Sequence, residues 1–127
     1  MKKLFSIRLA LSACAGVLAF GCSKDSAAPP KAVSAEQAPA TLQETFKETA
    51  PAPVKELATD AGAAFTAQDY PRAVVALDTL SLRSDISRQQ REAAVAALMA
   101  ANKALEERAG AGDKAAQAFL ARRRATK

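Results

Sequence analysis

Residues 54–80 read VKELATDAGAAFTAQDYPRAVVALDTL and decide the fold, because they hold two helical runs separated by Gln68-Asp69. In the first run, apolar residues recur every three or four positions and therefore share one helical face. These residues are Val54, Leu57, Ala58, Ala61, Ala64 and Phe65. The second run starts at Tyr70-Pro71, with proline at the first helical position, where it is well tolerated. Its inward face is Ala73, Val74, Leu77 and Leu80. The pattern predicts helices over about 53–67 and 71–82.

The turn between these runs carries a family resemblance. An aromatic residue near the end of the first helix precedes an Asp-Tyr turn, and a small residue follows three positions after the Tyr. The matching residues are Phe65, Asp69, Tyr70 and Ala73. Residues 61–80 thus resemble a single tetratricopeptide-like helical hairpin. They depart from that family because no Trp precedes them, Gln68 replaces the turn Gly, and no second copy follows.

An ordinary hairpin of two helices is the alternative interpretation of the same segment. In either case we expect Phe65, Tyr70, Ala73 and Leu77 to belong to the structural core. Tyr70 would fill the wedge at the turn, and Ala73 would let the two helices approach closely.

Two more helices are expected downstream. Ser87 and Gln90 have the spacing of a capping box, which predicts a helix over about 88–109 that ends at Gly110 and Gly112. Its expected inward face is Val95, Leu98, Met99, Asn102 and Leu105. Asp113 then caps a last helix over about 114–124, which carries Ala116, Phe119 and Leu120 and ends in Arg122-Arg123-Arg124. No segment has a strand pattern, so the predicted fold class is all-α, a small domain of three to four helices over 53–127.

The segment before this domain is rich in Ala and Pro and predicts a linker over 22–52. Within it, Thr41 and Glu44 have capping-box spacing, and Leu42 and Phe46 lie four residues apart. A short helix over about 42–50, ended by Pro51, is therefore predicted inside the linker.

The amino terminus has the layout of an export signal. Lys2, Lys3 and Arg8 precede an apolar run over 9–20, which is too short to span a bilayer, and the run ends in Gly21-Cys22. The residues Leu18-Ala19-Phe20-Gly21-Cys22 resemble the signal-cleavage motif, the lipobox, of bacterial lipoproteins.

The resemblance implies that residues 1–21 are removed and that Cys22 is lipidated, in the manner of a palmitate-type anchor. It also implies a place in the cell envelope. Ser23 stands where an Asp retains some lipoproteins in the inner membrane, so the outer membrane, facing the periplasm, is expected. Two alternatives are lipidation at Cys14 and an ordinary secretory signal that is cut elsewhere.

Composition excludes several functions. Removing the three basic residues of the signal from the 18 in the 127-residue chain leaves 15 against 13 acidic residues, a charge of about +2, which gives no reason to expect a nucleic-acid partner. The chain has no His, which excludes Ser-His-Asp and Cys-His catalysis and His-based metal sites. Once the signal is removed, Cys22 is the one remaining thiol, so no intramolecular disulfide can form.

The remaining polar patterns indicate surface rather than chemistry. Glu106 and Glu107 are adjacent, so on a helix they point about 100° apart and cannot share a proton across a cleft. We therefore expect no enzymatic activity, no cofactor and no metal, and a helical domain that binds a protein partner or a second copy of itself. An enzyme would need a pocket with convergent polar groups.

A structural tether is a further alternative. Small helical lipoproteins of the outer membrane join peptidoglycan through a C-terminal Lys that follows basic residues, and this chain ends in Arg122-Arg123-Arg124-Ala125-Thr126-Lys127.

Overall fold

The computed structural model describes residues 30–126, and this part of the chain is all-α, as predicted. Its helices are α1 (Ala38–Phe46), α2 (Ala52–Thr66), α3 (Tyr70–Ser81), α4 (Arg88–Gly110) and α5 (Lys114–Ala125). No strand occurs within the described range. The predicted signal peptide, Cys22 and Lys127 lie outside the described residues. Among residues 30–126, no helix is both long and apolar enough to cross a bilayer.

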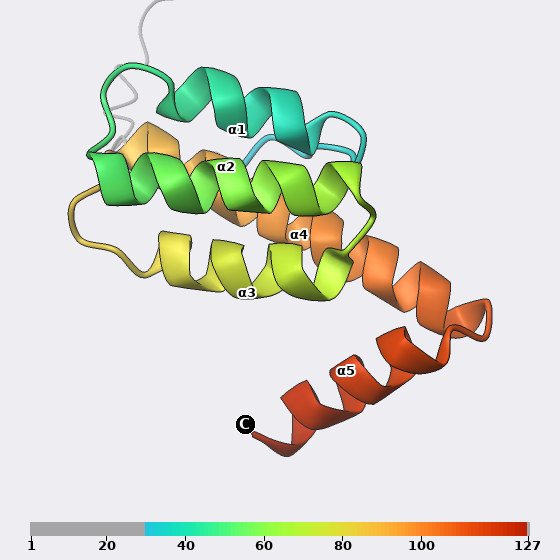
Figure 1. Cartoon of the computed structure of the whole chain (residues 1–127). Helices are drawn as coiled ribbons and strands as arrows, with labels where there is room; N and C mark the ends of the chain where they lie inside the picture. Colours follow the sequence, from blue (N-terminus) through green and yellow to red (C-terminus); the bar gives the residue numbers. More distant parts are fainter. Residues whose placement is uncertain (1–29, 127) are drawn as a thin grey trace, which may run out of the picture.

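The first four helices pack as a closed bundle. Each packs against the next in the chain, and α4 packs against α1 as well as α3, which closes the ring (Figure 1). α4 is the longest helix, and its C-terminal part extends past the ends of α2 and α3 (Figure 1). α5 then turns back below α3, where its half-buried Phe119 and Leu120 pack on the core. The ion pair between Arg123 and Asp78, 3.2 Å, joins α5 to α3.

Caps predicted from the sequence fix the starts of the later helices. Ser87 Oγ accepts a hydrogen bond from Gln90 N, 3.1 Å, and Gln90 Oε1 accepts one from Ser87 N, 2.9 Å, which confirms the capping box at α4. Asp113 accepts hydrogen bonds from the first-turn amides of α5, which confirms that cap also. These bonds satisfy amides that a helix leaves without partners at its first turn.

The domain begins earlier than the sequence predicted. α1 is not a helix within a linker, because Ala38 and Leu42 are fully buried and Phe46 is 2% exposed, all within the main core. Val33 and Ala35 also pack partly against that core. The described chain therefore enters the domain near residue 33, and the predicted domain start at 53 is wrong by a whole helix.

The predicted start of α1 is also wrong. It lies at Ala38 rather than Leu42, and the reciprocal side-chain bonds join Ser34 and Gln37 instead of Thr41 and Glu44. Both pairs have the same spacing. Starting at Ala38 adds four residues to the helix, and the first of them, Ala38, is fully buried in the core.

The inward face of α4 differs from the predicted one. Met99 is 61% exposed and Val95 and Asn102 are only half-buried, whereas the buried positions are mostly alanines. The buried residues of α4 are Gln90, Ala94, Ala96, Ala97, Ala100, Ala101, Ala104 and Leu105. Because α4 packs against three helices, α1, α3 and α5, its buried surface is wide, and small side chains allow these neighbours to approach closely. The prediction selected the largest apolar residues and thereby favoured the wrong face.

Candidate functional site: a groove between α1 and α2

A groove of about 440 Å³ runs along the outer side of the α1–α2 pair. This volume lies within the range of small-molecule and peptide-side-chain sites, roughly 300–1,000 Å³. Its lining residues all come from these two helices and the residue that follows α1: Pro39, Leu42, Gln43, Phe46, Lys47, Lys55, Ala58, Thr59, Gly62, Ala63 and Thr66. The groove therefore exists only because α1 docks onto α2.

The floor of the groove is apolar and its rim is polar. Leu42, Phe46 and Ala58 form the floor and are themselves buried, so they are held rigidly by the core. Gln43 and Thr59 are exposed on opposite rims. At the far end Gly62 brings no side chain into the groove; a methyl group there would lie 3.8 Å from Pro39, in ordinary contact. An apolar floor between polar rims suits a ligand with one apolar face.

The charge of the groove is of one sign. Lys47 follows the last residue of α1 and Lys55 lies in the first turn of α2, so both stand at the end near the α1–α2 connection. No carboxylate lines the groove. Neither lysine takes part in an ion pair within residues 30–126. An anionic group bound at this end would therefore meet two ammonium groups that are not already neutralised.

The opposite side of α1 has the opposite charge. A second groove, between α1, the residues before it and α4, is lined by Glu36, Glu44 and Glu92 with Lys31 as its one cation. Arg88 pairs with Glu92 at 2.9 Å and reduces that negative charge. The charged residues that line the two grooves flanking α1 thus differ in sign.

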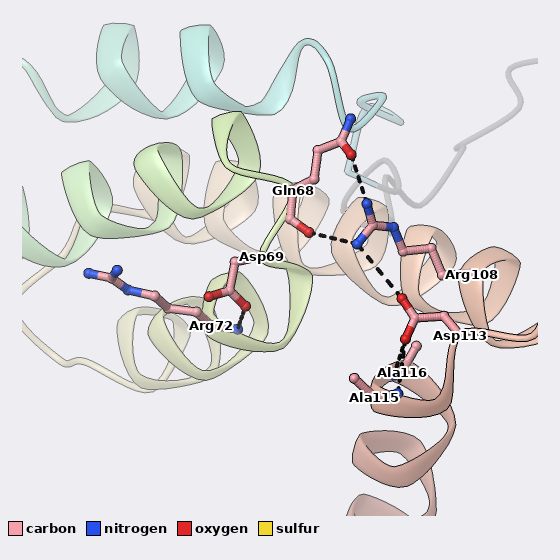
Figure 2. Close-up of polar contacts among 7 residues, drawn as sticks. All are labelled: Gln68, Asp69, Arg72, Arg108, Asp113, Ala115 and Ala116. Atoms are coloured by element: carbon pink, nitrogen blue, oxygen red, sulfur yellow. Dashed lines mark hydrogen bonds and ion pairs between the residues drawn. The ribbon is translucent and has the colours of Figure 1, made fainter.

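A polar clamp fixes the far end of the bundle. Gln68 adopts φ 56°, a left-handed conformation that costs a non-glycine residue about 1–2 kcal/mol. Arg108 of α4 donates to Gln68 O, 3.1 Å, and to Gln68 Oε1, 2.7 Å, and lies 3.9 Å from Asp113, the cap of α5 (Figure 2). One guanidinium therefore joins the α2–α3 turn to the α4–α5 turn.

The residues predicted as structural core lie around this clamp. Phe65, Ala73 and Leu77 are buried, and Tyr70 is half-buried. The Tyr70 ring meets Phe65 edge-to-face with 6.1 Å between centroids, and the Arg108 guanidinium lies 5.1 Å from the Tyr70 centroid. Asp69 caps α3 through Arg72 N, 3.3 Å, so the Asp-Tyr turn is occupied by structural contacts (Figure 2). Nothing in the sequence indicated Arg108, which lies 40 residues from its partner.

Carboxylates in the described region form no site for acid–base chemistry or metal. Glu106 and Glu107 are both exposed, and no group of three potential metal ligands occurs among residues 30–126. Hydrogen bonding from Arg83 lowers the pKa of Asp85. The pKa of Glu36 is lowered mainly by a backbone hydrogen bond and, to a smaller extent, by a hydrogen bond with the Ser34 side chain. Both residues are exposed, as expected of surface groups.

Comparisons with family models, curated proteins and solved structures found no match to this chain.

Proposed function

We propose that this chain is a lipid-anchored protein of the bacterial cell envelope whose helical domain docks another protein and performs no catalysis. The single observation that carries the docking role is the groove between α1 and α2. It combines a rigid apolar floor with two unpaired lysines at one end. Such a surface suits a partner with an apolar face and a negative end.

The anchor rests on the sequence. Cys22 follows a short apolar run and Gly21, in the arrangement that resembles a lipoprotein signal. Acyl chains contribute about 0.8 kcal/mol per buried methylene, so more than one chain holds a protein stably at a membrane. Residues 23–32 separate Cys22 from the start of the helical domain, which lets the domain stand off the lipid surface, in the outer membrane facing the periplasm.

Fatty-acid labelling tests the anchor. Cells that produce the chain are grown with radiolabelled palmitate, and the wild type is compared with Cys22→Ala and with Cys14→Ala as the matched control. We expect label in the wild type and in Cys14→Ala, and no label in Cys22→Ala, which should accumulate as uncleaved precursor. Label that persists in Cys22→Ala would show that the anchor site is wrong.

Crosslinking tests the docking role. The acylated protein is recovered from envelopes that have been treated with a bifunctional crosslinker, and bound proteins are identified by mass spectrometry. A protein that is recovered with the wild type, and lost when Thr59→Trp fills the groove, supports docking there. Reproducible recovery of the chain alone would count against any protein partner.

A tether to peptidoglycan is the second candidate. Arg122 and Arg124 are exposed in the last turn of α5, shortly before Lys127, and attract this segment to an anionic wall. Cell walls boiled in detergent should then retain the chain until a muramidase digests them. Deletion of Lys127 should abolish retention, and a chain that never stays with the wall is not a tether.

A further inference from the structure

We propose that the occupant of the α1–α2 groove is an amphipathic helix of a partner protein, with its acidic residues at the end nearest Lys47 and Lys55. This inference rests on the proposed docking function and specifies the chemistry of the partner. Four features of the groove support it: its walls, its rims, its length and its charge.

The walls of the groove favour a helix over an extended peptide. Both walls are helices, whose interior amides and carbonyls already bond within their own helix. An extended segment laid between them would find few free backbone groups to pair with, and unpaired backbone groups are costly when buried. A helix satisfies its own backbone and brings only side chains to the groove, which is the helix-in-groove mode of recognition.

The rims of the groove favour a helix over an acyl chain. Small or short side chains along α2, including Thr59, Gly62, Ala63 and Thr66, let a helix backbone approach closely. The Thr59 hydroxyl lies beside any occupant, where an acyl chain could not use it, whereas the Thr66 hydroxyl donates to Gly62 O, 3.1 Å. Small-molecule sites usually bury most of their ligand, roughly 70–90% of its surface, and a groove open along one side between two helices gives less cover.

The length of the groove sets the size of the segment. From Lys55 to Thr66, α2 advances eleven residues, about 16 Å at 1.5 Å per residue. A partner helix of about three turns would cover this distance. Its apolar residues at three-four spacing would rest on exposed Ala63 and on the methyl groups of Thr59 and Thr66. The buried core residues of α1 and α2 lie beneath this surface.

The charge of the groove sets its direction. Both lysines stand at the α1–α2 connection and no carboxylate lines the groove, so the occupant's acidic residues belong at that end. The acidic groove on the other side of α1, lined by Glu36 and Glu44, disfavours the same segment through like-charge repulsion. The two sides of α1 therefore discriminate between partners of opposite charge.

Site-specific photocrosslinking in the producing bacterium tests the proposal with the full chain. A photoreactive amino acid is placed at Thr59 on the groove rim or, as the control, at exposed Ser84 in the α3–α4 loop. Crosslinked peptides are then sequenced by mass spectrometry. We expect the probe at Thr59 to capture a segment of another protein with apolar residues at three-four spacing and Asp or Glu at one end.

Charge reversal completes the test. The double variant Lys47→Glu/Lys55→Glu should lower the yield at Thr59 at least tenfold, whereas Lys114→Glu, an exposed lysine on α5, should leave it unchanged. The same melting curve for all three proteins would show that folding is intact. An unchanged yield in the double variant overturns the proposed polarity and with it the inference.

The remaining outcomes also decide the matter. Capture of lipid, of a second copy of this chain, or of a segment without acidic residues at Thr59 overturns the inference. Protein captured at Ser84 but not at Thr59 would leave the docking function standing and remove the groove from it. No protein at either position would remove both.

Discussion

Leu42 provides the sharpest test of the fold, because it decides whether α1 belongs to the domain. Its side chain is fully buried between α1 and the rest of the core. Leu42→Ala removes roughly three methylene equivalents, about 2.4 kcal/mol at about 0.8 kcal/mol each, and leaves a cavity that adds to the loss. The expected loss in the free energy of unfolding is therefore about 3 kcal/mol, within the usual range of about 2–5 kcal/mol.

A loss of this size is large for a small domain. In a domain of about 100 residues, each kcal/mol shifts the melting temperature by about 4–8 °C, so the expected decrease is about 12–24 °C. The matched control is Leu82→Ala. It makes the same chemical change at the surface, because Leu82 is 84% exposed. The control should stay within about 0.5 kcal/mol of the wild type.

Thermal and urea unfolding followed by circular dichroism measure both variants. If Leu42→Ala and Leu82→Ala have the same melting temperature, α1 is not docked on the domain. The groove that α1 forms with α2 then does not exist either. A shortened chain covering 53–127 provides a second measurement. It lacks Ala38, Leu42 and Phe46 from the core and should lose cooperative unfolding, although the sequence alone placed the whole helical domain within these residues.

Three further predictions follow from the rest of the domain. Leu77→Ala removes another fully buried side chain and should cost about 2–5 kcal/mol in urea unfolding; an unchanged midpoint would contradict the described core. Arg108→Ala removes two hydrogen bonds to the α2–α3 turn and should cost about 1–2 kcal/mol by the same measurement, whereas Arg124→Ala, an exposed arginine, should cost less than about 0.5 kcal/mol; equal effects would show that the clamp contributes nothing. The pKa values of Glu36 and Asp85 are lowered, so their contribution to stability is complete above their unfolded values, about 4.3 and 3.9, and is lost as the pH falls through the folded pKa. Because the chain has no His, the melting temperature should be nearly constant from pH 6 to 8 and fall below about pH 4; a transition near pH 6.5 would refute this assignment.

Sequence alone determined the helical class and most helix ends, because these depend on nearby residues. The cap of α4 joins residues three apart, and the cap of α5 joins residues two and three apart. Such contacts are short in sequence and leave a residue pattern that can be recognised without the fold. For the same reason, the four later helices begin and end within one or two residues of the predicted bounds.

Tertiary structure alone decided what depends on which helices meet. The four-residue spacing of Leu42 and Phe46 was visible in the sequence. Only the docking of α1 on α2 and α4 buries these two side chains in the core and creates the groove. The buried face of α4 was likewise set by the helices packed against it, α1, α3 and α5, and not by the positions of its largest side chains. Close packing against these helices favours small residues on that face. Gln68 can hold a left-handed conformation at a glycine position because Arg108, 40 residues away, bonds to its carbonyl and side chain. Contacts between residues so far apart depend on the packing of whole helices, and a local sequence pattern carries no record of that packing.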